Sequence, residues 1–248
     1  GKTVMNILFF DIDGTLANGL EVPASAEKAI HQLRESGDNL VFICTGRPLN
    51  YVQRYFSAYA DGFICFNGRY SYLKGKTIYD MPLSKEEIRD ITAIIDHCRG
   101  GYVFYNNTSE FKGGYHGTYI PLNLRDEAVY NFNVFFKDKE HFKQIEEALK
   151  EQVIFNPHGK MPHADATIAG SDKGVAIMKT MEALQIPFEN SYAFGDGSND
   201  VSMFHSVAHS VAMGNALDIL KQEAEYITDD IDRDGIKNAL LHYGLIKE

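Results

Sequence analysis

The chain has 248 residues, 44% of them hydrophobic, and a formal net charge of −10 at pH 7, so it can bury a substantial core in one large domain or two smaller ones. The acidic balance disfavours nucleic acid and anionic membranes as partners, because both bind basic faces. It still permits a phosphorylated ligand, provided that a metal ion or a lysine supplies positive charge locally.

Strand and helix patterns alternate through the first part of the chain. Apolar runs predict strands at 4–10, 40–45 and 62–67, followed by a hairpin at 70–79. Pro23 precedes a helical pattern that stops at Gly37, and Pro48 opens a second helix. This strand–helix–strand order predicts a parallel sheet with right-handed crossovers.

From about residue 82 the pattern changes to an α+β segment. Ser84 and Glu87 predict a capping box for a helix that runs to about Cys98. Further patterns predict a helix at 139–150 and strands at 102–106, 131–136, 152–156 and 163–169. The Gly- and Tyr-rich stretch 112–119 is expected to be either an exposed loop or a substrate-facing lid.

Strand–helix alternation resumes at Ser171. The expected helices lie at 172–185, 199–206, 216–224 and from about 234, and the expected strands at 191–194, 210–213 and 225–228. Residues 1–81 and 169–248 therefore predict one α/β core domain with a doubly wound, Rossmann-like parallel sheet. Residues 82–168 would form an α+β cap domain inserted into it.

Cysteine use and the N-terminal residues favour an intracellular protein. The three cysteines, Cys44, Cys65 and Cys98, show no CxxC spacing and are expected to be buried, reduced thiols. No signal-peptide core is visible at the N-terminus, and no apolar run approaches the roughly 18 residues of a membrane span. We therefore expect a soluble protein in the cytoplasm.

Polar groups follow the apolar strands at the points where these end. They are Asp11 and Asp13, then Thr45-Gly46-Arg47, then Ser171-Asp172-Lys173-Gly174 at a helix start, then Gly195-Asp196-Gly197-Ser198-Asn199-Asp200. In a parallel sheet such ends converge on one crevice. Taken singly, each group has a structural explanation: an acidic turn, a strand–loop junction, a solvated lysine or a Ca²⁺-like segment. Their order and spacing together favour a site.

This set of groups suits phosphoryl chemistry. Aspartate oxygens without His or Cys ligands select a hard ion, for which Mg²⁺ is the usual match. Mg²⁺, Lys173 and backbone amides would neutralise a phosphate dianion. One carboxylate in line with phosphorus can attack it to form an aspartyl-phosphate, and a second, two residues on, can protonate the leaving alcohol and later deprotonate water.

Four motifs resemble those of the haloacid dehalogenase-like (HAD) hydrolases. They are Asp11-Ile12-Asp13-Gly14-Thr15, Thr45-Gly46-Arg47, Lys173-Gly174 and Gly195-Asp196-Gly197-Ser198-Asn199-Asp200. The long insertion preceded by Asn67-Gly68 resembles the Cof-type, C2B-capped branch of that superfamily. Residues 164–167 and 202–216 are similar to bacterial sugar-phosphate phosphatases of the branch. The resemblance covers essentially the whole chain, with the cap as its least characteristic part.

The resemblance implies a role for each motif residue. Asp11 would be the nucleophile and Asp13 the general acid/base. The phosphate or substrate would be bound by Thr45, Gly46, Arg47, Lys173 and Asn199. Mg²⁺ would be held by Asp11, the backbone carbonyl of Asp13, Asp196, and Asp200 either directly or through water. Arg47 could equally brace its loop.

Three other residues stand out beside these motifs. Arg69 follows Asn67-Gly68 where a small residue is more usual in the family, which concerns only the rim of the crevice. His158 and His163 flank a short segment that favours a hinge between cap and core over a metal site.

The predicted function is a Mg²⁺-dependent phosphatase acting on a small phosphorylated metabolite, with hexose and pentose phosphates as the first candidates. A phosphomutase on the same scaffold is the enzymatic alternative, and it would have to keep water away from the phosphoryl group. The alternative from another class is a non-catalytic phosphate-binding regulatory module. Degenerate modules of that kind lose one of the two N-terminal aspartates, whereas this chain keeps both. The oligomeric state is left open.

Overall fold

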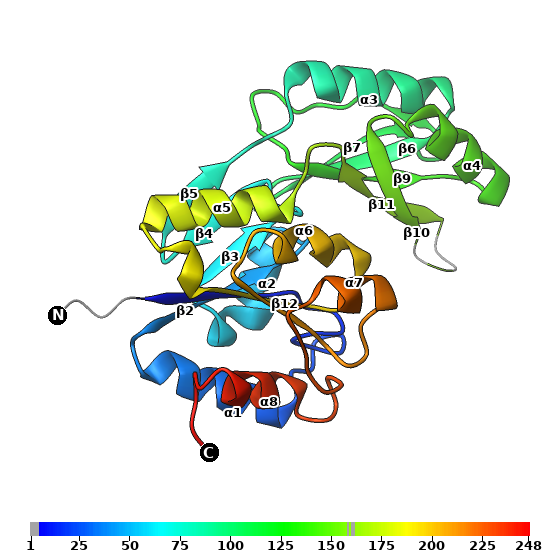
Figure 1. Ribbon diagram of the computed structural model, residues 1–248. Helices are drawn as coiled ribbons and strands as arrows, with labels where there is room; N and C mark the ends of the chain where they lie inside the picture. The colour runs from blue at the N-terminus through cyan, green and yellow to red at the C-terminus, as the bar shows by residue number, and fades with distance from the viewer. Residues whose placement is uncertain (1–4, 158, 160–161) are drawn as a thin grey trace. The chain divides into compact units, whose positions relative to one another are not determined.

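The computed structural model describes residues 5–157, 159 and 162–248. It divides into two compact units, the core unit (1–47, 51–80 and 172–248) and the inserted unit (48–50 and 81–171). Figure 1 shows the elements of both. The hinge expected between His158 and His163 lies partly outside the described residues, as does the start of the strand expected at 4–10.

The core unit is built on an eight-stranded sheet in the order β14-β13-β12-β1-β2-β3-β4-β5. The strands are β1 (Asn6–Phe10), β2 (Asn39–Cys44), β3 (Gly62–Cys65), β4 (Tyr70–Leu73), β5 (Lys76–Asp80), β12 (Ser191–Gly195), β13 (His209–Ala212) and β14 (Tyr226–Ile227). All neighbours from β14 to β3 are parallel, and only the β3–β4 and β4–β5 pairs are antiparallel. The expected doubly wound parallel sheet is confirmed.

Helices cover both faces of this sheet. They are α1 (Ala24–Glu35), α2 (Leu49–Phe56), α5 (Lys173–Leu184), α6 (Val201–Phe204), α7 (Asp218–Glu223) and α8 (Gly235–His242). Helices α1 and α8 lie side by side on one face, and α5 and α6 lie on the other (Figure 1). In the described part of the chain, no helix is both long and apolar enough to cross a bilayer.

Strand β1 lies at the centre of the sheet because it is apolar on both sides. Ile7, Leu8, Phe9 and Phe10 are all fully buried. Ile7 and Phe9 pack into the layer that contains α5 and α6, so the alternating side chains of Leu8 and Phe10 belong to the opposite face. Two-sided burial of this kind is typical of parallel sheets covered by helices.

The inserted unit is a six-stranded antiparallel sheet in the order β10-β11-β9-β6-β7-β8, with two helices. The strands are β6 (Gly101–Tyr105), β7 (Glu110–Tyr115), β8 (Tyr119–Ile120), β9 (Asn131–Phe135), β10 (Val153–Pro157) and β11 (His163–Ile168), and the helices are α3 (Lys85–His97) and α4 (Lys139–Ala148). Phe104, Phe132 and Val134 of the sheet pack with Ile95 of α3 and Ile145 of α4 in one buried core.

The expectation of a loop at 112–119 is wrong over most of its length. Most of this stretch belongs to β7 and β8, and only residues 116–118 turn between them. Gly113 and Gly114 lie against the ring of Tyr102, where an added Cβ would come within 2.6 and 2.7 Å of ring atoms, respectively. The glycines therefore provide room for close packing of a strand on an aromatic ring, which a flexible loop would not need.

Several boundaries also differ from the sequence patterns. The strand expected at 62–67 ends at Cys65, because Phe66, Asn67 and Gly68 all have positive φ. The helix expected at 199–206 is a 3₁₀ turn (Ser198–Asp200) followed by the short α6.

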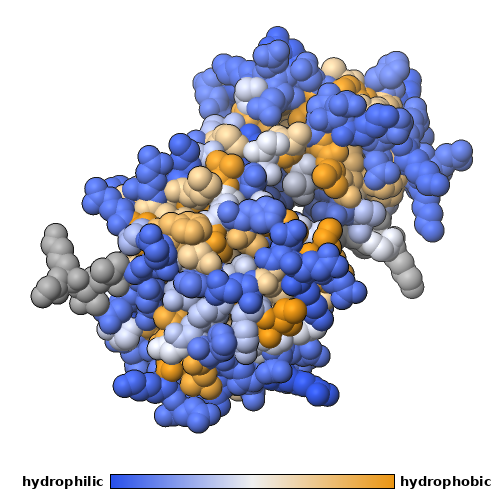
Figure 2. Space-filling model, in the orientation of Figure 1, coloured by the Kyte–Doolittle hydropathy of each residue, from blue (hydrophilic) through white to orange (hydrophobic). Residues whose placement is uncertain are grey.

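On the face drawn in Figure 2, hydrophilic residues predominate and apolar ones are scattered, as on most globular surfaces.

The capping box of α3 is present as expected and provides a test of the fold. The Ser84 hydroxyl accepts a bond from the Glu87 backbone N–H (3.0 Å), and the Glu87 carboxylate accepts one from the Ser84 N–H (3.0 Å). Ser84→Ala should lower the free energy of unfolding by about 1 kcal/mol, since it leaves a helix N–H unsatisfied. Thermal unfolding would show this as a drop of roughly 2–4 °C.

Ser84→Asp serves as the matched control, because an aspartate at this position can still accept the same bond. Equal losses of stability in the two variants would contradict the assignment of the cap.

Candidate active site

Asp11 stands directly after β1, at the carboxyl end of the central strand. Its backbone N–H donates to the carbonyl of Phe194 on β12 (3.1 Å), which continues the ladder between the two strands. The chain then turns sharply, and the Leu16 N–H donates to the carbonyls of Asp11 (3.3 Å) and Ile12 (3.0 Å). This turn places Asp13 on the surface, two residues beyond Asp11.

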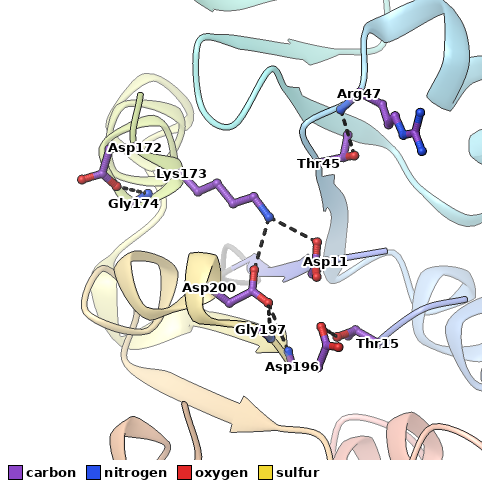
Figure 3. Close-up of polar contacts among 10 residues, drawn as sticks. All are labelled: Asp11, Thr15, Thr45, Arg47, Asp172, Lys173, Gly174, Asp196, Gly197 and Asp200. Atoms are coloured by element: carbon purple, nitrogen blue, oxygen red, sulfur yellow. Dashed lines mark hydrogen bonds and ion pairs between the residues drawn. The ribbon is translucent and has the colours of Figure 1, made fainter. Parts of the chain in front are cut away.

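Lys173 joins Asp11 to Asp200. Its Nζ lies 3.2 Å from Asp11 Oδ1 and 3.2 Å from Asp200 Oδ1, as Figure 3 shows. The exposed fractions of the three side chains are 2% for Lys173, 14% for Asp11 and 0% for Asp200. A lysine so deeply buried is tolerated only when it is paired, because an isolated ammonium loses several kcal/mol of hydration.

Asp200 also organises the turn that follows β12. Its second oxygen, Oδ2, accepts bonds from the backbone N–H groups of Asp196 and Gly197, both at 3.1 Å. With Lys173 on Oδ1, all of these donors converge on one buried carboxylate. Asp200 therefore fixes the position of Asp196 as well as that of the lysine (Figure 3).

Asp196 completes a cluster of three carboxylates. One oxygen of each of Asp11, Asp196 and Asp200 lies within 4.8 Å of the others. The Thr15 hydroxyl donates to Asp196 Oδ1 (3.4 Å). Gly14, at φ +78°, lies beneath the Asp196 carboxylate, and any Cβ there would overlap it. The Gly-Thr of the first motif thus gives Asp196 its space and one of its hydrogen bonds.

The electrostatics of the cluster show an excess of negative charge. Burial raises the pKa of Asp11 well above its usual value, Lys173 opposes the rise, and Asp200 and Asp196 add to it. Burial also raises the pKa of Asp196. Burial alone would lower the pKa of Lys173, but Asp11 and Asp200 outweigh it and raise that pKa, so the ammonium stays charged. Three carboxylates facing one ammonium offer oxygen ligands that could hold a further cation.

The loop after β2 carries Thr45, Gly46 and Arg47. Thr45 is buried, and its Oγ1 accepts a bond from the Arg47 N–H (3.1 Å). The Arg47 side chain is exposed, and its guanidinium lies 4.9 Å from the centre of the Tyr51 ring. Such a cation–π contact holds the arginine along its own chain segment. Figure 3 shows Thr45 and Arg47 on the strand-end loop beside the one that carries Asp11.

The remaining predicted site residues lie at the surface of the core unit. Asp13 and Asn199 are both exposed, and the Asp13 carboxylate is not part of the three-carboxylate cluster. The structure thus brings Lys173, Asp11, Asp196 and Asp200 together from three distant parts of the sequence.

Two supporting contacts were not foreseen from the sequence. Asp172 caps α5, since its Oδ1 accepts bonds from the N–H groups of Gly174 (2.7 Å) and Val175 (3.4 Å). The signal for it was available, because an aspartate before a helical pattern is a preferred N-cap. The bond from Thr15 to Asp196 had no such signal, because the two residues are remote in sequence.

Comparisons with known proteins give matches over nearly the whole chain. The family model of the haloacid dehalogenase-like hydrolases matches residues 8–115 and 109–240. The putative phosphatase YkrA of Bacillus subtilis (strain 168) is 30% identical over 254 residues, which cover 97% of this chain and 98% of the relative. A second relative from that organism, 5-amino-6-(5-phospho-D-ribitylamino)uracil phosphatase YcsE, is 27% identical over 97% of this chain and 96% of its own length.

A solved structure matches over nearly the whole length. The HAD subclass IIB sugar phosphatase BT4131 superposes with a TM-score of 0.75 at 27% identity, covering 98% of this chain and 100% of that one. The match includes the inserted unit as well as the core unit. Together with the family model, it establishes that this chain belongs to the haloacid dehalogenase-like hydrolases.

Proposed function

We propose that this hydrolase is a Mg²⁺-dependent phosphatase that cleaves small phosphate monoesters through an aspartyl-phosphate on Asp11. The family and its named phosphatases support the reaction class. The observation that carries the proposal is the bridge from Lys173 to Asp11 and Asp200, with Asp196 beside it. It combines a nucleophile, a fixed positive charge and a set of cation ligands at one strand end.

The carboxylate cluster fits a small divalent cation. Its donors are oxygens alone, and it carries more negative charge than Lys173 can balance, which is the chemistry that Mg²⁺ prefers. Asp11, Asp196, the Asp13 carbonyl and Asp200, directly or through water, would hold it. When bound, the ion would neutralise charge on the phosphate oxygens.

Asp11 acts as nucleophile in the first half of the reaction. The oxygen that does not face Lys173 attacks phosphorus, an O–P bond forms to Asp11, and the bond to the ester oxygen breaks. Lys173 holds the other oxygen and stays protonated, so its charge remains available to the phosphate. Thr45, Gly46, Arg47 and Asn199 would supply further donors to the phosphate or the substrate.

Asp13 acts as general acid and then as general base. It gives its proton to the oxygen of the leaving alcohol as the ester bond breaks, and then takes a proton from the water that attacks the phosphoryl group. That attack releases inorganic phosphate and restores the Asp11 carboxylate. The exposed position of Asp13, two residues from the half-buried Asp11, suits both exchanges.

Sugar phosphates are the first substrates to test. BT4131 is named as a sugar phosphatase, and YcsE is named for a substrate with a phosphorylated ribityl chain. We propose that residues 82–168 act as the cap that selects among such esters.

The three cysteines are buried and form no disulfide, which supports a reducing, cytoplasmic setting.

Asp11→Asn should reduce turnover to background. The substitution keeps the size of the side chain and an acceptor for Lys173, but it removes the attacking charge. Hydrolysis of a phosphate monoester needs an acceleration of up to about 10²¹-fold, so no other route should be visible. The measurement is release of phosphate with Mg²⁺, with Asp90→Asn on the exposed surface of α3 as the control. Activity within about tenfold of the wild type would rule out Asp11 as the nucleophile.

Chelation should abolish the activity, and Mg²⁺ should restore it. Ca²⁺ should be a poor substitute, because it is larger and takes more ligands. Asp196→Asn should remove most of the Mg²⁺ response. Without metal, the same variant should melt at a higher temperature than the wild type, because burial disfavours the charge it removes. Full activity in excess EDTA would contradict the proposed metal site.

Asp13→Asn should separate two kinds of substrate. A sugar phosphate loses an alkoxide that needs a proton, whereas p-nitrophenolate hardly needs one. Turnover of a hexose phosphate should therefore fall much further than turnover of p-nitrophenyl phosphate. Because the second step needs the same group as base, an aspartyl-phosphate on Asp11 should accumulate and be trappable. Equal losses on both substrates, with nothing trapped, would leave Asp13 without an acid/base role.

A further inference from the structure

The turn after β3 has an unusual backbone. Phe66, Asn67 and Gly68 have φ values of +53°, +55° and +102°, three positive values in succession. Positive φ is rare for a bulky side chain such as phenylalanine and costs of order 1–3 kcal/mol. Such a conformation persists only where the surroundings impose it, so the contacts of this turn indicate its purpose.

On one side the turn is tied to the loop after β2. The Asn67 N–H donates to the Thr45 carbonyl (2.9 Å), and the Phe66 N–H donates to the Arg47 carbonyl (3.3 Å). The Asn67 carboxamide packs on Gly46, where an added Cβ would lie 3.2 Å from Asn67 Nδ2. Residues 66 and 67 therefore hold the backbone of residues 45–47. We call this segment the phosphate loop, because its residues are the proposed phosphate ligands.

On the other side the turn abuts the start of α5. The Cα of Gly68 faces the junction of Asp172 and Lys173: an added Cβ would overlap the Asp172 carbonyl and lie 2.8 Å from the Lys173 nitrogen. The first turn of α5 is also confined from behind, because a Cβ on Gly174 would overlap the Ser202 carbonyl of α6. The backbone of Lys173 is thus enclosed between two close contacts.

We propose that Asn67-Gly68 is a positioning element of the active site, in which Asn67 sets the place of Gly46 and Gly68 sets the place of Lys173. The inference rests on the proposed function and deepens it. The strained turn couples the phosphate loop to the lysine, so that both keep one spacing relative to Asp11. A displacement of about 1 Å in such a group can lower a rate by about 10²-fold. Asn67 and Gly68 act through Gly46 and Lys173, and are positioning residues.

The first test compares two glycines of similar backbone conformation. Gly68 (φ +102°) faces Asp172 and Lys173, whereas Gly75 (φ +86°), in the β4–β5 hairpin, has nothing within 4 Å of an added Cβ. Alanine imposes a similar backbone strain at both positions. Gly68→Ala should lower kcat for p-nitrophenyl phosphate by about 10²-fold through displacement of Lys173, and Gly75→Ala should stay within about twofold of the wild type. Equal rates in the two variants would overturn the role of Gly68.

The second test uses Asn67→Gly, which removes the carboxamide and also relieves the positive φ. Its thermal midpoint should stay at or near that of the wild type. The KM for p-nitrophenyl phosphate and the inhibition constant of inorganic phosphate should each rise about tenfold, with a smaller change in kcat, because the phosphate loop loses its support. Wild-type KM and phosphate inhibition would overturn the role of Asn67, and with it the proposed coupling of the phosphate loop to Lys173, whether or not Gly68→Ala folds.

The two tests also separate this inference from the proposed function. A wild-type protein that hydrolyses no phosphate ester would contradict the proposed function, and calorimetric binding of inorganic phosphate to wild type and Asn67→Gly would then decide the inference. Equal affinity of the two proteins for phosphate would overturn it, and weaker binding by the variant would support it.

Discussion

Lys173 is buried between Asp11 and Asp200, and this pair of 3.2 Å contacts constrains the rest of the core unit. A buried ammonium that lost a partner would leave an uncompensated charge, and breaking a buried pair typically costs about 3–5 kcal/mol. Asp11 follows β1, Lys173 begins α5, and Asp200 ends the turn after β12. Three segments far apart in the sequence must therefore reach the same sheet edge for any of these charges to be accommodated.

The same cluster also explains why an active site can oppose stability. Burial and mutual repulsion raise the pKa values of Asp11 and Asp196, which means that the fold disfavours their charged forms. Neutral side chains would suit the fold better but could perform neither the proposed attack on phosphorus nor the proposed binding of a divalent cation. Cation binding would relieve the repulsion and stabilise the folded state by mass action. The proposed cofactor would thus have a structural effect as well as a chemical one.

Close approach, more than flexibility, is what glycine contributes around the site. Gly14 leaves room for the Asp196 carboxylate, Gly68 for the Asp172–Lys173 peptide and Gly174 for a carbonyl of α6. Gly113 and Gly114 do the same for the Tyr102 ring in the inserted unit. These residues let backbones and charged groups meet at distances that any side chain would prevent. Gly14 and Gly68 also have positive φ, a backbone conformation that disfavours every residue except glycine.

The sequence by itself determined the order of the elements, the parallel sheet and the groups that would meet at its edge. These depend on local periodicity, such as the apolar run of β1, and on the rule that parallel strands end on one side. The family motifs, read as a set, also indicated the site residues and their proposed roles. What local patterns could not distinguish was a glycine needed for packing from one needed for a loop, and so the strands at 110–120 were missed.

Only the tertiary structure decided which of the polar groups lie together and which remain at the surface. It joined Lys173 to Asp11 and Asp200, left Asp13 and Asn199 exposed, and turned Arg47 towards Tyr51. It also revealed that Asn67-Gly68 touches both the loop after β2 and the start of α5. The physical reason is that these contacts join residues remote in sequence, so their distances and burial depend on how the whole sheet and its helices pack.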